Sequence, residues 1–223
     1  MDWSPILISM RTAGLSIVFT FFMGILAAWM VVRISHPLVK TILDGIFTIP
    51  LVLPPTVAGF FLLYVFGVKR PFGQFFLEYF SVKIAFSWGA TVLAAVVMSF
   101  PLMYRSARGA FEQVDDTLVQ AARTLGMGEW TIFRKVLLAN AVPGVVSGGV
   151  LAFARGLGEF GATAMIAGNI AGKTRTLPMA VYSEAAAGNM EAAYSYVAII
   201  VVIAFLSVFL MNGAMWYSQK KSR

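Results

Sequence analysis

Long apolar runs separated by short charged segments dominate this sequence of 223 residues. A helix needs roughly 20 apolar residues to cross the ~30 Å hydrocarbon layer of a bilayer. Hydrophobic residues make up 59% of the chain and charged residues only 12%, which is far more apolar than a soluble domain. We therefore expect one all-α integral membrane domain with five spans, at residues 12–34, 46–68, 84–103, 143–166 and 194–216.

The rest of the composition narrows the possible chemistry. No cysteine is present, which excludes disulfides and thiol chemistry, and the single histidine, His36, leaves no histidine metal cluster. No nucleophile–base pair is visible, so the sequence predicts neither an enzyme nor a cofactor site. The formal net charge is +7, but the basic residues lie between the apolar runs and form no continuous patch. This distribution indicates membrane topology and not nucleic-acid binding.

Three prolines interrupt the second span, at Pro50, Pro54 and Pro55. Each removes a backbone N–H donor and clashes with a carbonyl one turn earlier, so a straight helix is not expected. Broken backbone at membrane depth is tolerated only against protein or a water-filled cavity. A half-helix beginning near Thr56 would point free N–H groups into the interior, which favours an anion. A packing kink without a ligand role is the alternative.

Small residues recur every four positions in the fourth span. Such a stripe lets helix backbones approach closely in lipid. We expect it to pack within the chain or against a second copy. The stripe consists of Gly144, Gly148, Ala152 and Gly156.

Arg155 and Glu159 lie one turn apart in the same span. Charged side chains are unfavourable in hydrocarbon, so these two should face a cavity or each other. One interpretation is a self-neutralising pair that holds the helix end. The other is that Arg155 attracts an anion while Glu159 sets its rotamer. The candidates for a translocation path are therefore Pro50, Pro54, Pro55, Thr56, Arg155 and Glu159.

The most polar stretch between spans lies within residues 104–142. Thr117 and Gln120 have the spacing of a capping box, which predicts the start of a helix. Gly126 and Gly128 should end it, because glycine readily takes the left-handed conformation of helix ends. A second short helix is expected over 130–138. A helix, a glycine elbow and a second helix at a membrane face suit docking into a cleft of another protein.

Lys and Arg residues are distributed unevenly between the two sides of the predicted spans. Ten lie on the side of the 104–142 segment: Arg33, Lys40, Arg105, Arg108, Arg123, Arg134, Lys135, Lys220, Lys221 and Arg223. Six lie on the other side, and Arg155 is inside a span. Because cytoplasmic loops carry the excess of positive charge, we predict the N-terminus outside and the C-terminus in the cytoplasm.

The polar stretch resembles the EAA loop of ABC-importer permeases, whose pattern is Glu-Ala-Ala, three residues, Gly, nine residues and Ile-x-Leu-Pro. Gln120 stands in place of Glu, so an ion pair expected with an ATPase would become a neutral hydrogen bond. Ala139 stands in place of Pro, so the second helix should continue more smoothly into the next span. The resemblance implies an ATPase-coupling loop that contains Gln120, Ala121, Ala122, Arg123, Gly126, Gly128, Trp130 and Arg134.

Three further stretches make the chain similar to molybdate-transport permeases of the type I ABC importer family. They are IPLVLPPTVAGFFLLYVFG, AFSWGATVLAAVVMSFPLMYRSARGAFEQVD and LAFARGLGEFGATAMIAGNIAGKTRTLPMAVY. The resemblance covers residues 7–212, and tungstate and sulfate permeases are built similarly. It implies a homodimer of five-span subunits in the cell membrane, with two cytoplasmic ATPase subunits. It also implies an extracytoplasmic binding protein that delivers a tetrahedral oxyanion.

Residues 167–174, AGNIAGKT, match a loose form of the phosphate-binding loop. A functional loop of this kind lies between a strand and a helix, whereas this one follows a membrane span on the outer side. We therefore expect no nucleotide binding here and assign the energy source to a separate ATPase. An ATPase-independent secondary transporter is the alternative, but it would more often show an inverted repeat or several paired intramembrane charges.

Overall fold

All regular structure is helical in the part of the chain that is described. The computed structural model describes residues 2–221, without the side chains of 211, 212 and 214–221. Helices satisfy their backbone hydrogen bonds internally, which a lipid environment requires. In order, they are α1 (Ser4–Val32), α2 (Pro37–Val52), α3 (Pro55–Phe66), α4 (Pro71–Phe80), α5 (Trp88–Glu112), α6 (Asp116–Thr124), α7 (Glu129–Ile132), the π-helix η1 (Phe133–Leu137), α8 (Leu138–Leu157), α9 (Gly161–Ile166), α10 (Leu177–Ala186) and α11 (Met190–Lys221).

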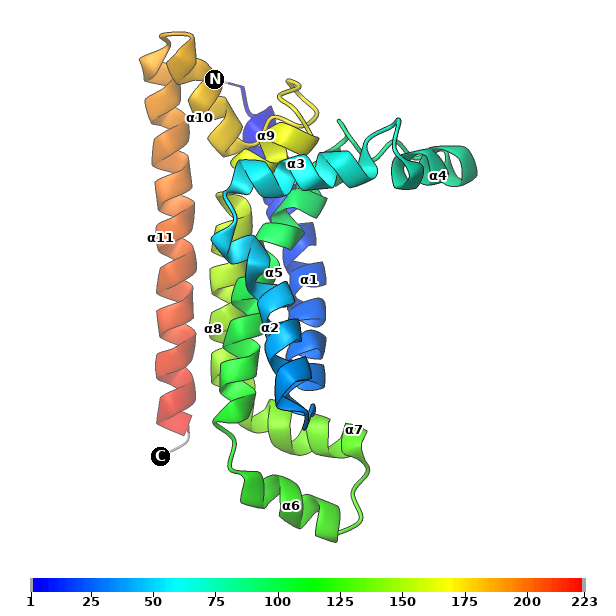
Figure 1. Cartoon of the computed structure of the whole chain (residues 1–223). Helices are drawn as coiled ribbons and strands as arrows, with labels where there is room; N and C mark the ends of the chain where they lie inside the picture. Colours follow the sequence, from blue (N-terminus) through cyan, green and yellow to red (C-terminus); the bar gives the residue numbers. More distant parts are fainter. Residues whose placement is uncertain (1, 222–223) are drawn as a thin grey trace.

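Four helical units are long and apolar enough to cross a membrane: α1, α5, the continuous helix α7–η1–α8, and α11. The bent pair α2 and α3 is the candidate fifth span. In Figure 1, α1, α2, α5, α8 and α11 run lengthwise, with α6 and α7 at one end and α9 and α10 at the other. α1 starts near the α9–α10 end, and α11 runs from that end toward the α6–α7 end (Figure 1).

The second span is broken, but not at the first of its prolines. Pro50 lies inside α2, while Leu53 and Pro54 adopt extended backbone and α3 begins at Pro55. A residue before proline is disfavoured in the helical region, and the consecutive prolines restrict Leu53 and Pro54 in succession. The prediction that Pro50 interrupts the helix is therefore wrong. α2 and α3 are bent by 110° at the break, so α3 lies across the end of the bundle (Figure 1).

The helix bounds also differ from the predicted spans at other places. α1 begins at Ser4, ahead of the expected 12–34, since Pro5 in its first turn needs no helical hydrogen bond. The fourth span was expected at 143–166, whereas α8 contains Pro143 and ends at Leu157, before the separate helix α9. The side chains of Lys220, Lys221 and Arg223, used to predict orientation, lie outside the described residues.

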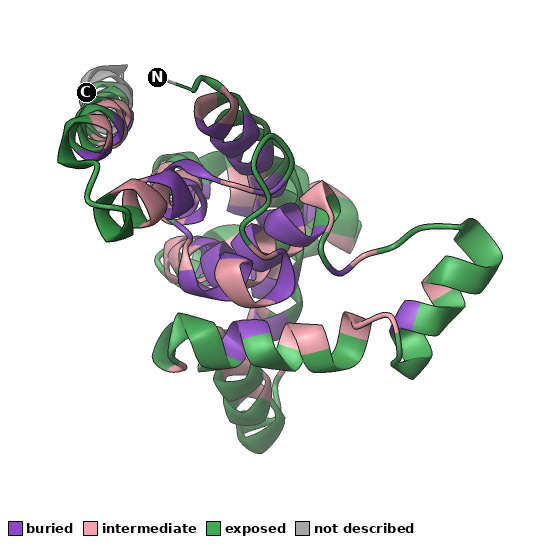
Figure 2. Cartoon of the chain, turned by 90° about the horizontal axis from the view of Figure 1, so that it is seen from above, coloured by how far each residue is buried: buried purple, intermediate pink, exposed green. Residues whose placement is uncertain are grey.

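The packed core lies where α1, α5 and α8 meet, and Figure 2 shows buried residues gathered there with exposed ones around them. Tyr104 and Phe111 of α5 are among the largest buried side chains. Hydroxyl groups also join α1 to α5: Thr12 Oγ1 lies 2.9 Å from Thr91 Oγ1. Such hydrogen bonds help hold helices together in lipid, where burying apolar side chains against one another gives little driving force.

The small-residue stripe of α8 faces α5 and α1. A Cβ added at Gly144 would lie 2.6 Å from the Cβ of Ala110, and one at Gly148 would lie 2.5 Å from the Cβ of Ser106. The remaining members, Ala152 and Gly156, are also buried. The glycines therefore let the backbone of α8 approach α5 more closely than any larger residue would allow.

Candidate coupling site and translocation path

The coupling segment, which comprises α6, α7 and η1, begins with α6, and this helix is capped by Asp115 and not by Thr117. Asp115 Oδ1 accepts a hydrogen bond of 2.9 Å from the backbone amide of Thr117, and Thr117 itself lies inside the helix. The predicted capping box at Thr117 is therefore wrong, because the carboxylate two residues earlier already occupies the helix start. The same amide, donating to the charged form, lowers the pKa of the Asp115 carboxyl.

The glycine elbow follows α6 directly. Gly126 has φ +74° and donates its amide to the Arg123 carbonyl at 2.9 Å, while Met127 donates to the Ala122 carbonyl at 3.1 Å. These two bonds form a Schellman motif, which needs a left-handed residue after the helix. Gly128, the N-cap residue of α7, has φ −67°, so its backbone conformation does not require glycine. The elbow depends on Gly126 alone.

The second helix of the segment continues into the next span without a break. α7 passes into η1, a π-helical stretch, and then into α8. The sequence, with Ala139 where its relatives' pattern has proline, predicts this continuity. Figure 1 shows α6 and α7 lying across the end of the bundle and α8 running along it, so the helix turns between α7 and the main length of α8. π-helical turns are a recognised cause of helix bends, and Pro143 removes a further hydrogen bond.

The predicted coupling residues do not all face outward. Ala122 is 5% exposed and packs inward, whereas Ala121 is exposed. Of the alanine pair, only Ala121 is therefore available to a partner. Two large apolar side chains of the segment are also exposed, Leu125 at 80% and Trp130 at 56%. The other exposed members are Gln120, Arg123, Gly126, Gly128 and Arg134.

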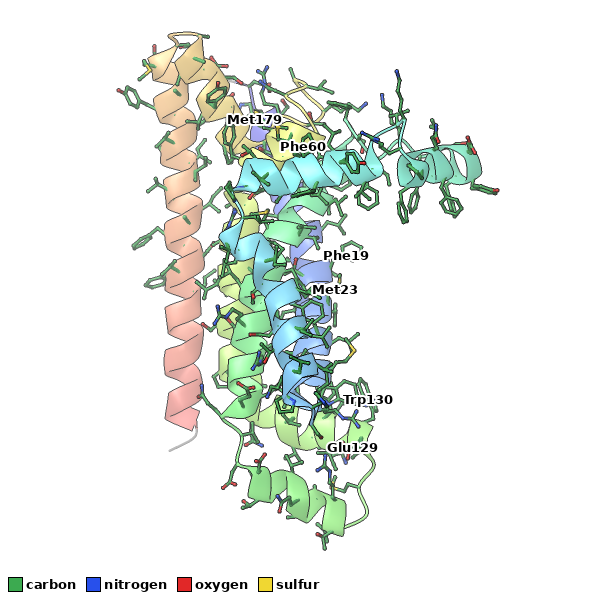
Figure 3. All side chains as sticks on the ribbon, in the orientation of Figure 1. Phe19, Met23, Phe60, Glu129, Trp130 and Met179 are labelled. Carbon is green, nitrogen blue, oxygen red and sulfur yellow. The ribbon has the colours of Figure 1, made fainter. Side chains whose placement is uncertain are left out.

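Glu129 joins the coupling segment to α1, and the sequence analysis did not single it out. Its Oε1 lies 2.9 Å from Arg123 Nε, and its Oε2 lies 3.4 Å from Arg33 Nη2. The bond from Arg123 to this carboxylate raises the pKa of the guanidinium. Figure 3 shows Glu129 and Trp130 at the junction between α7 and the core. No sequence spacing pointed to this contact, since Arg33 belongs to a distant helix.

A second group of charges ties α2 to α5 at the same end. Arg108 of α5 pairs with Asp44 of α2, and Lys40 Nζ lies 3.0 Å from Glu112 Oε1. The Tyr104 hydroxyl donates to Asp44 Oδ1 at 3.0 Å. Lys40 and Asp44 within α2, and Arg108 and Glu112 within α5, have i,i+4 spacing, and this charge pattern is visible in the sequence. The cluster neutralises charges that border the apolar core.

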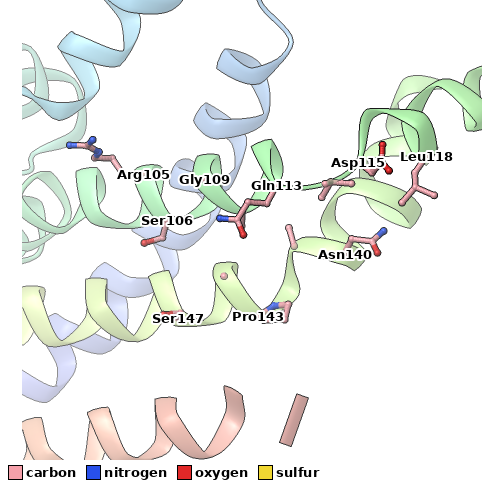
Figure 4. Close-up of a pocket in the computed structure, with 13 residues that line it drawn as sticks. Arg105, Ser106, Gly109, Gln113, Asp115, Leu118, Asn140, Pro143 and Ser147 are labelled. Carbon is pink, nitrogen blue, oxygen red and sulfur yellow. The ribbon is translucent and has the colours of Figure 1, made fainter. Parts of the chain in front are cut away.

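A cavity of about 640 Å³ opens beside α6, between α5 and α8. In Figure 4, Ser106 of α5, Gln113 at the C-cap of α5 and Asn140 of α8 surround it. Arg105 is the only basic side chain among its described lining residues, and Asp115 is also among them. The cavity therefore offers polar groups next to the coupling segment without the concentrated positive charge that would hold an oxyanion.

Arg155 and Glu159 form the predicted pair. Arg155 Nη1 lies 2.7 Å from Glu159 Oε2, and the Glu159 side chain is 1% exposed. Glu159 Oε1 also accepts a hydrogen bond of 2.8 Å from the Ala162 amide, so the carboxylate caps α9. Such a buried carboxylate needs both partners, because an unpaired charge there would be strongly unfavourable. The pair thus holds the turn between α8 and α9.

The same turn packs against the break between α2 and α3. A Cβ added at Gly161, the first residue of α9, would lie 2.9 Å from the Cβ of Pro55 and 3.1 Å from the amide nitrogen of Thr56. Pro54, Pro55 and Thr56 are themselves exposed, whereas Pro50 is half-buried. The fold therefore brings the broken backbone of α2–α3 and the Arg155–Glu159 turn to one place.

The loop at residues 167–174 is closed on itself. It follows α9, a helix, and the Thr174 hydroxyl is buried. That hydroxyl accepts from the Ile170 amide at 3.0 Å and donates to the Gly168 carbonyl at 3.1 Å. In a phosphate-binding loop this hydroxyl would coordinate the metal ion on the phosphates, whereas here it makes both of its hydrogen bonds within the turn.

Comparison with known sequences identifies the family of this chain. The family described as binding-protein-dependent transport system inner membrane component matches residues 20–223. The chain is 47% identical over 182 residues to the molybdenum transport system permease protein ModB of Escherichia coli K12, covering 82% of this chain and 79% of that protein. The corresponding protein of Haemophilus influenzae is 36% identical over 223 residues, covering 100% and 96%. The sulfate transport system permease protein CysT of Salmonella typhimurium is 33% identical over 205 residues, covering 92% and 73%.

Solved structures show the same fold at low sequence identity. The methionine ABC transporter MetNI in an inward-facing conformation aligns with a TM-score of 0.73 at 18% identity, covering 96% of this chain and 94% of that chain. A bacterial ABC transporter that imports alginate aligns with a TM-score of 0.79 at 14% identity, covering 96% and 78%. The chain belongs to the family of inner membrane permease components of binding-protein-dependent ABC importers.

Proposed function

We propose that this chain is the permease subunit of an ATP-driven importer for a tetrahedral oxyanion, with molybdate as the substrate. The observation that carries the proposal is the order of sequence identity, 47% with a molybdenum permease against 33% with a sulfate permease. Tungstate has the same shape and charge as molybdate and should share its path. The path itself needs to accept only a compact dianion, so finer selection belongs to the binding protein.

The proposed orientation places the α6–α7 end in the cytoplasm and the chain's beginning outside. Arg33, Lys40, Arg105, Arg108 and Arg123 support it, because all belong to the ends of helices or to the segment at the α6–α7 end. An excess of Lys and Arg marks the cytoplasmic side of membrane proteins. In this orientation an ATPase reaches the coupling segment and a binding protein reaches the α9–α10 end.

The proposed assembly is a homodimer with two ATPase subunits, a binding protein outside and the surrounding bilayer. α2 supports the second copy, since it has no buried residue and exposes Ile42, Ile46 and Val52. α3, which is bent by 110° from α2, also exposes Phe60 and Phe61. An exposed apolar face next to broken backbone fits a subunit interface that encloses a path, because non-helical backbone is tolerated at membrane depth only against protein or water.

The proposed path runs past the break at Pro54, Pro55 and Thr56 and past Arg155. Arg155 is partly exposed while Glu159 is fully enclosed, so the guanidinium is the member of the pair that can meet a passing anion. Glu159 fixes its position and keeps the site from holding a net positive charge that would trap the substrate. Transport then proceeds by alternating access, with the coupling segment as the element that the ATPase moves.

The proposed ATPase-docking surface is the outer face of the coupling segment: Gln120, Ala121, Arg123, Gly126, Gly128, Trp130 and Arg134, with Leu125 between them. Ala122 supports that face from within. A Gln in place of the usual Glu makes the contact at position 120 a neutral hydrogen bond, which is about half as strong as a charge-assisted one. Apolar contact through Leu125 and Trp130 then carries more of the binding.

The test is uptake by the purified permease, reconstituted with its ATPase and binding protein, with molybdate, tungstate and sulfate competing. We expect ATP-dependent uptake of molybdate, inhibited by excess tungstate and weakly by sulfate. Preferential uptake of sulfate would instead indicate that this chain functions as a sulfate permease. Uptake without any ATPase bound would instead support the secondary-transporter alternative.

A further inference from the structure

We propose that Glu129 is the positioning residue that locks the coupling segment to α1, so that movement of α6 is transmitted to α1 as well as to α8. The proposal rests on the proposed function, because it assumes an ATPase that moves α6. It adds a named transmission contact in which Arg123 also belongs to the docking surface, whereas Glu129 and Arg33 do not.

The appreciable contacts of α6 within the described chain are with α7 and η1. Displacement of α6 can therefore leave along the short connection 113–115 to α5 or through the α7–η1 helix. From the α7–η1 helix two routes exist, along the helix into α8 or sideways into α1. The first route passes through η1, a π-helical stretch whose hydrogen bonding is less regular than that of an α-helix. A bend at η1 would absorb movement unless α7 is held to something else.

Glu129 supplies that hold by contacting an arginine on each side. Arg123, in the last turn of α6, contributes Nε at 2.9 Å and Nη2 at 3.4 Å to the two carboxylate oxygens. Arg33, the C-cap residue of α1, contributes Nη2 at 3.4 Å. One carboxylate therefore joins three helices, α6, α7 and α1.

Aromatic contacts reinforce the junction on the α1 side. The Trp29 ring lies 4.7 Å from the Phe133 ring and 5.8 Å from the Trp130 ring, measured between centroids. The Arg33 guanidinium lies 4.8 Å from the centroid of Trp29, within cation–π distance. Arg33 is thus placed by Trp29 for its contact with Glu129. The junction defines both the distance and the direction of α7 relative to α1.

The bridge should affect coupling far more than folding. The three side chains are 40–53% exposed, and partly exposed ion pairs add little to protein stability. The variant Glu129→Gln keeps the size of the side chain and removes its charge. It should therefore assemble normally with the ATPase while α1 no longer follows α6.

The experiment compares ATP hydrolysis with molybdate uptake in reconstituted complexes carrying Glu129→Gln or the remote carboxylate control Glu191→Gln. Coupling free energies between sites typically correspond to 5-fold or larger changes, so we expect uptake per ATP to fall by about 5-fold or more in Glu129→Gln. Hydrolysis and the amount of bound ATPase should stay within about 2-fold of the parent protein, and the control should match the parent throughout. Equal uptake per ATP in Glu129→Gln and the control would overturn the proposal.

Charge reversal separates the two contacts. The pair Arg123→Glu with Glu129→Arg restores attraction between α6 and α7 but sets two arginines, at 33 and 129, against each other. We expect this protein to stay uncoupled and expect further addition of Arg33→Glu to recover uptake per ATP. Full coupling in the double variant, or none in the triple variant, would overturn the role of the α1 contact. If the parent complex shows no ATP-driven molybdate uptake, that result contradicts the proposed function and not the proposed role of Glu129.

Discussion

The close packing of α8 on α5 gives the sharpest quantitative prediction, for the variant Gly148→Ala. The added Cβ would lie 2.5 Å from the Cβ of Ser106, where ordinary contact is 3.4–4 Å, so the two helices must separate by about 1 Å. Overpacking of this kind costs about 1–3 kcal/mol. For a chain of this size each kcal/mol lowers Tm by roughly 2–4 °C, so we expect a loss of about 2–12 °C.

The matched control is Gly109→Ala on α5, where an added Cβ meets no heavy atom within 4 Å. Because alanine is favoured over glycine in helices by about 1 kcal/mol, this control should keep or raise Tm. Thermal unfolding of the purified permease in detergent measures both. In a Ser106→Gly background the clash disappears, so Gly148→Ala should no longer destabilise the protein. If Gly148→Ala unfolds no earlier than Gly109→Ala, or if Ser106→Gly gives no relief, the packing argument is wrong.

The remaining predictions concern the elbow, the intramembrane pair and the cap. Gly126→Val places a β-branched residue at φ +74°, at about 1–3 kcal/mol of strain, and should lower uptake per ATP while leaving membrane insertion intact; unchanged uptake would refute a role for the elbow. Arg155→Leu leaves the Glu159 carboxylate without its ion-pair partner and should lower the membrane level of the protein, but it should lower uptake further than that; uptake per inserted protein equal to the parent would exclude a transport role for Arg155. Asp115→Ala should speed amide hydrogen exchange in α6. Folding lowers the pKa of the Asp115 carboxyl, so the ionised cap stabilises α6 fully at pH values above the usual carboxyl pKa. This stabilisation is lost as the pH falls through the lowered pKa of Asp115. In acid, the amide exchange rate of α6 in the parent protein should therefore approach that in the variant.

Much of the architecture follows from local rules that the sequence expresses directly. The apolar runs indicate how many segments can cross a bilayer, because hydrocarbon thickness sets the length of a helix. The break near Thr56 follows from consecutive prolines, and the elbow follows from a glycine after a helical segment. The pairing of Arg155 with Glu159 follows from their spacing on one helix. Each of these depends on residues within one or two turns of each other.

The tertiary structure decided which of several local options was used. Both Asp115 and Thr117 can cap a helix, and the backbone geometry selected Asp115. Ala121 and Ala122 are identical in the sequence, yet only Ala122 is buried, since α7 and η1 cover one side of α6. The glycines of α8 allow close packing with any neighbouring helix, and the topology of the fold determines that this neighbour is α5.

The contacts that link the helices at the α6–α7 end were decided by the fold alone. Arg33 meets Glu129, and Asp44 meets Arg108, although each pair is far apart in the sequence. Long charged side chains have many possible partners, and no periodicity distinguishes them before the helices are packed. The sequence by itself determined a membrane-spanning permease with a glycine elbow between two of its spans. Only the packing of α1 against α7 determined which charges hold it, because such contacts depend on distances between helices and not on spacing along one.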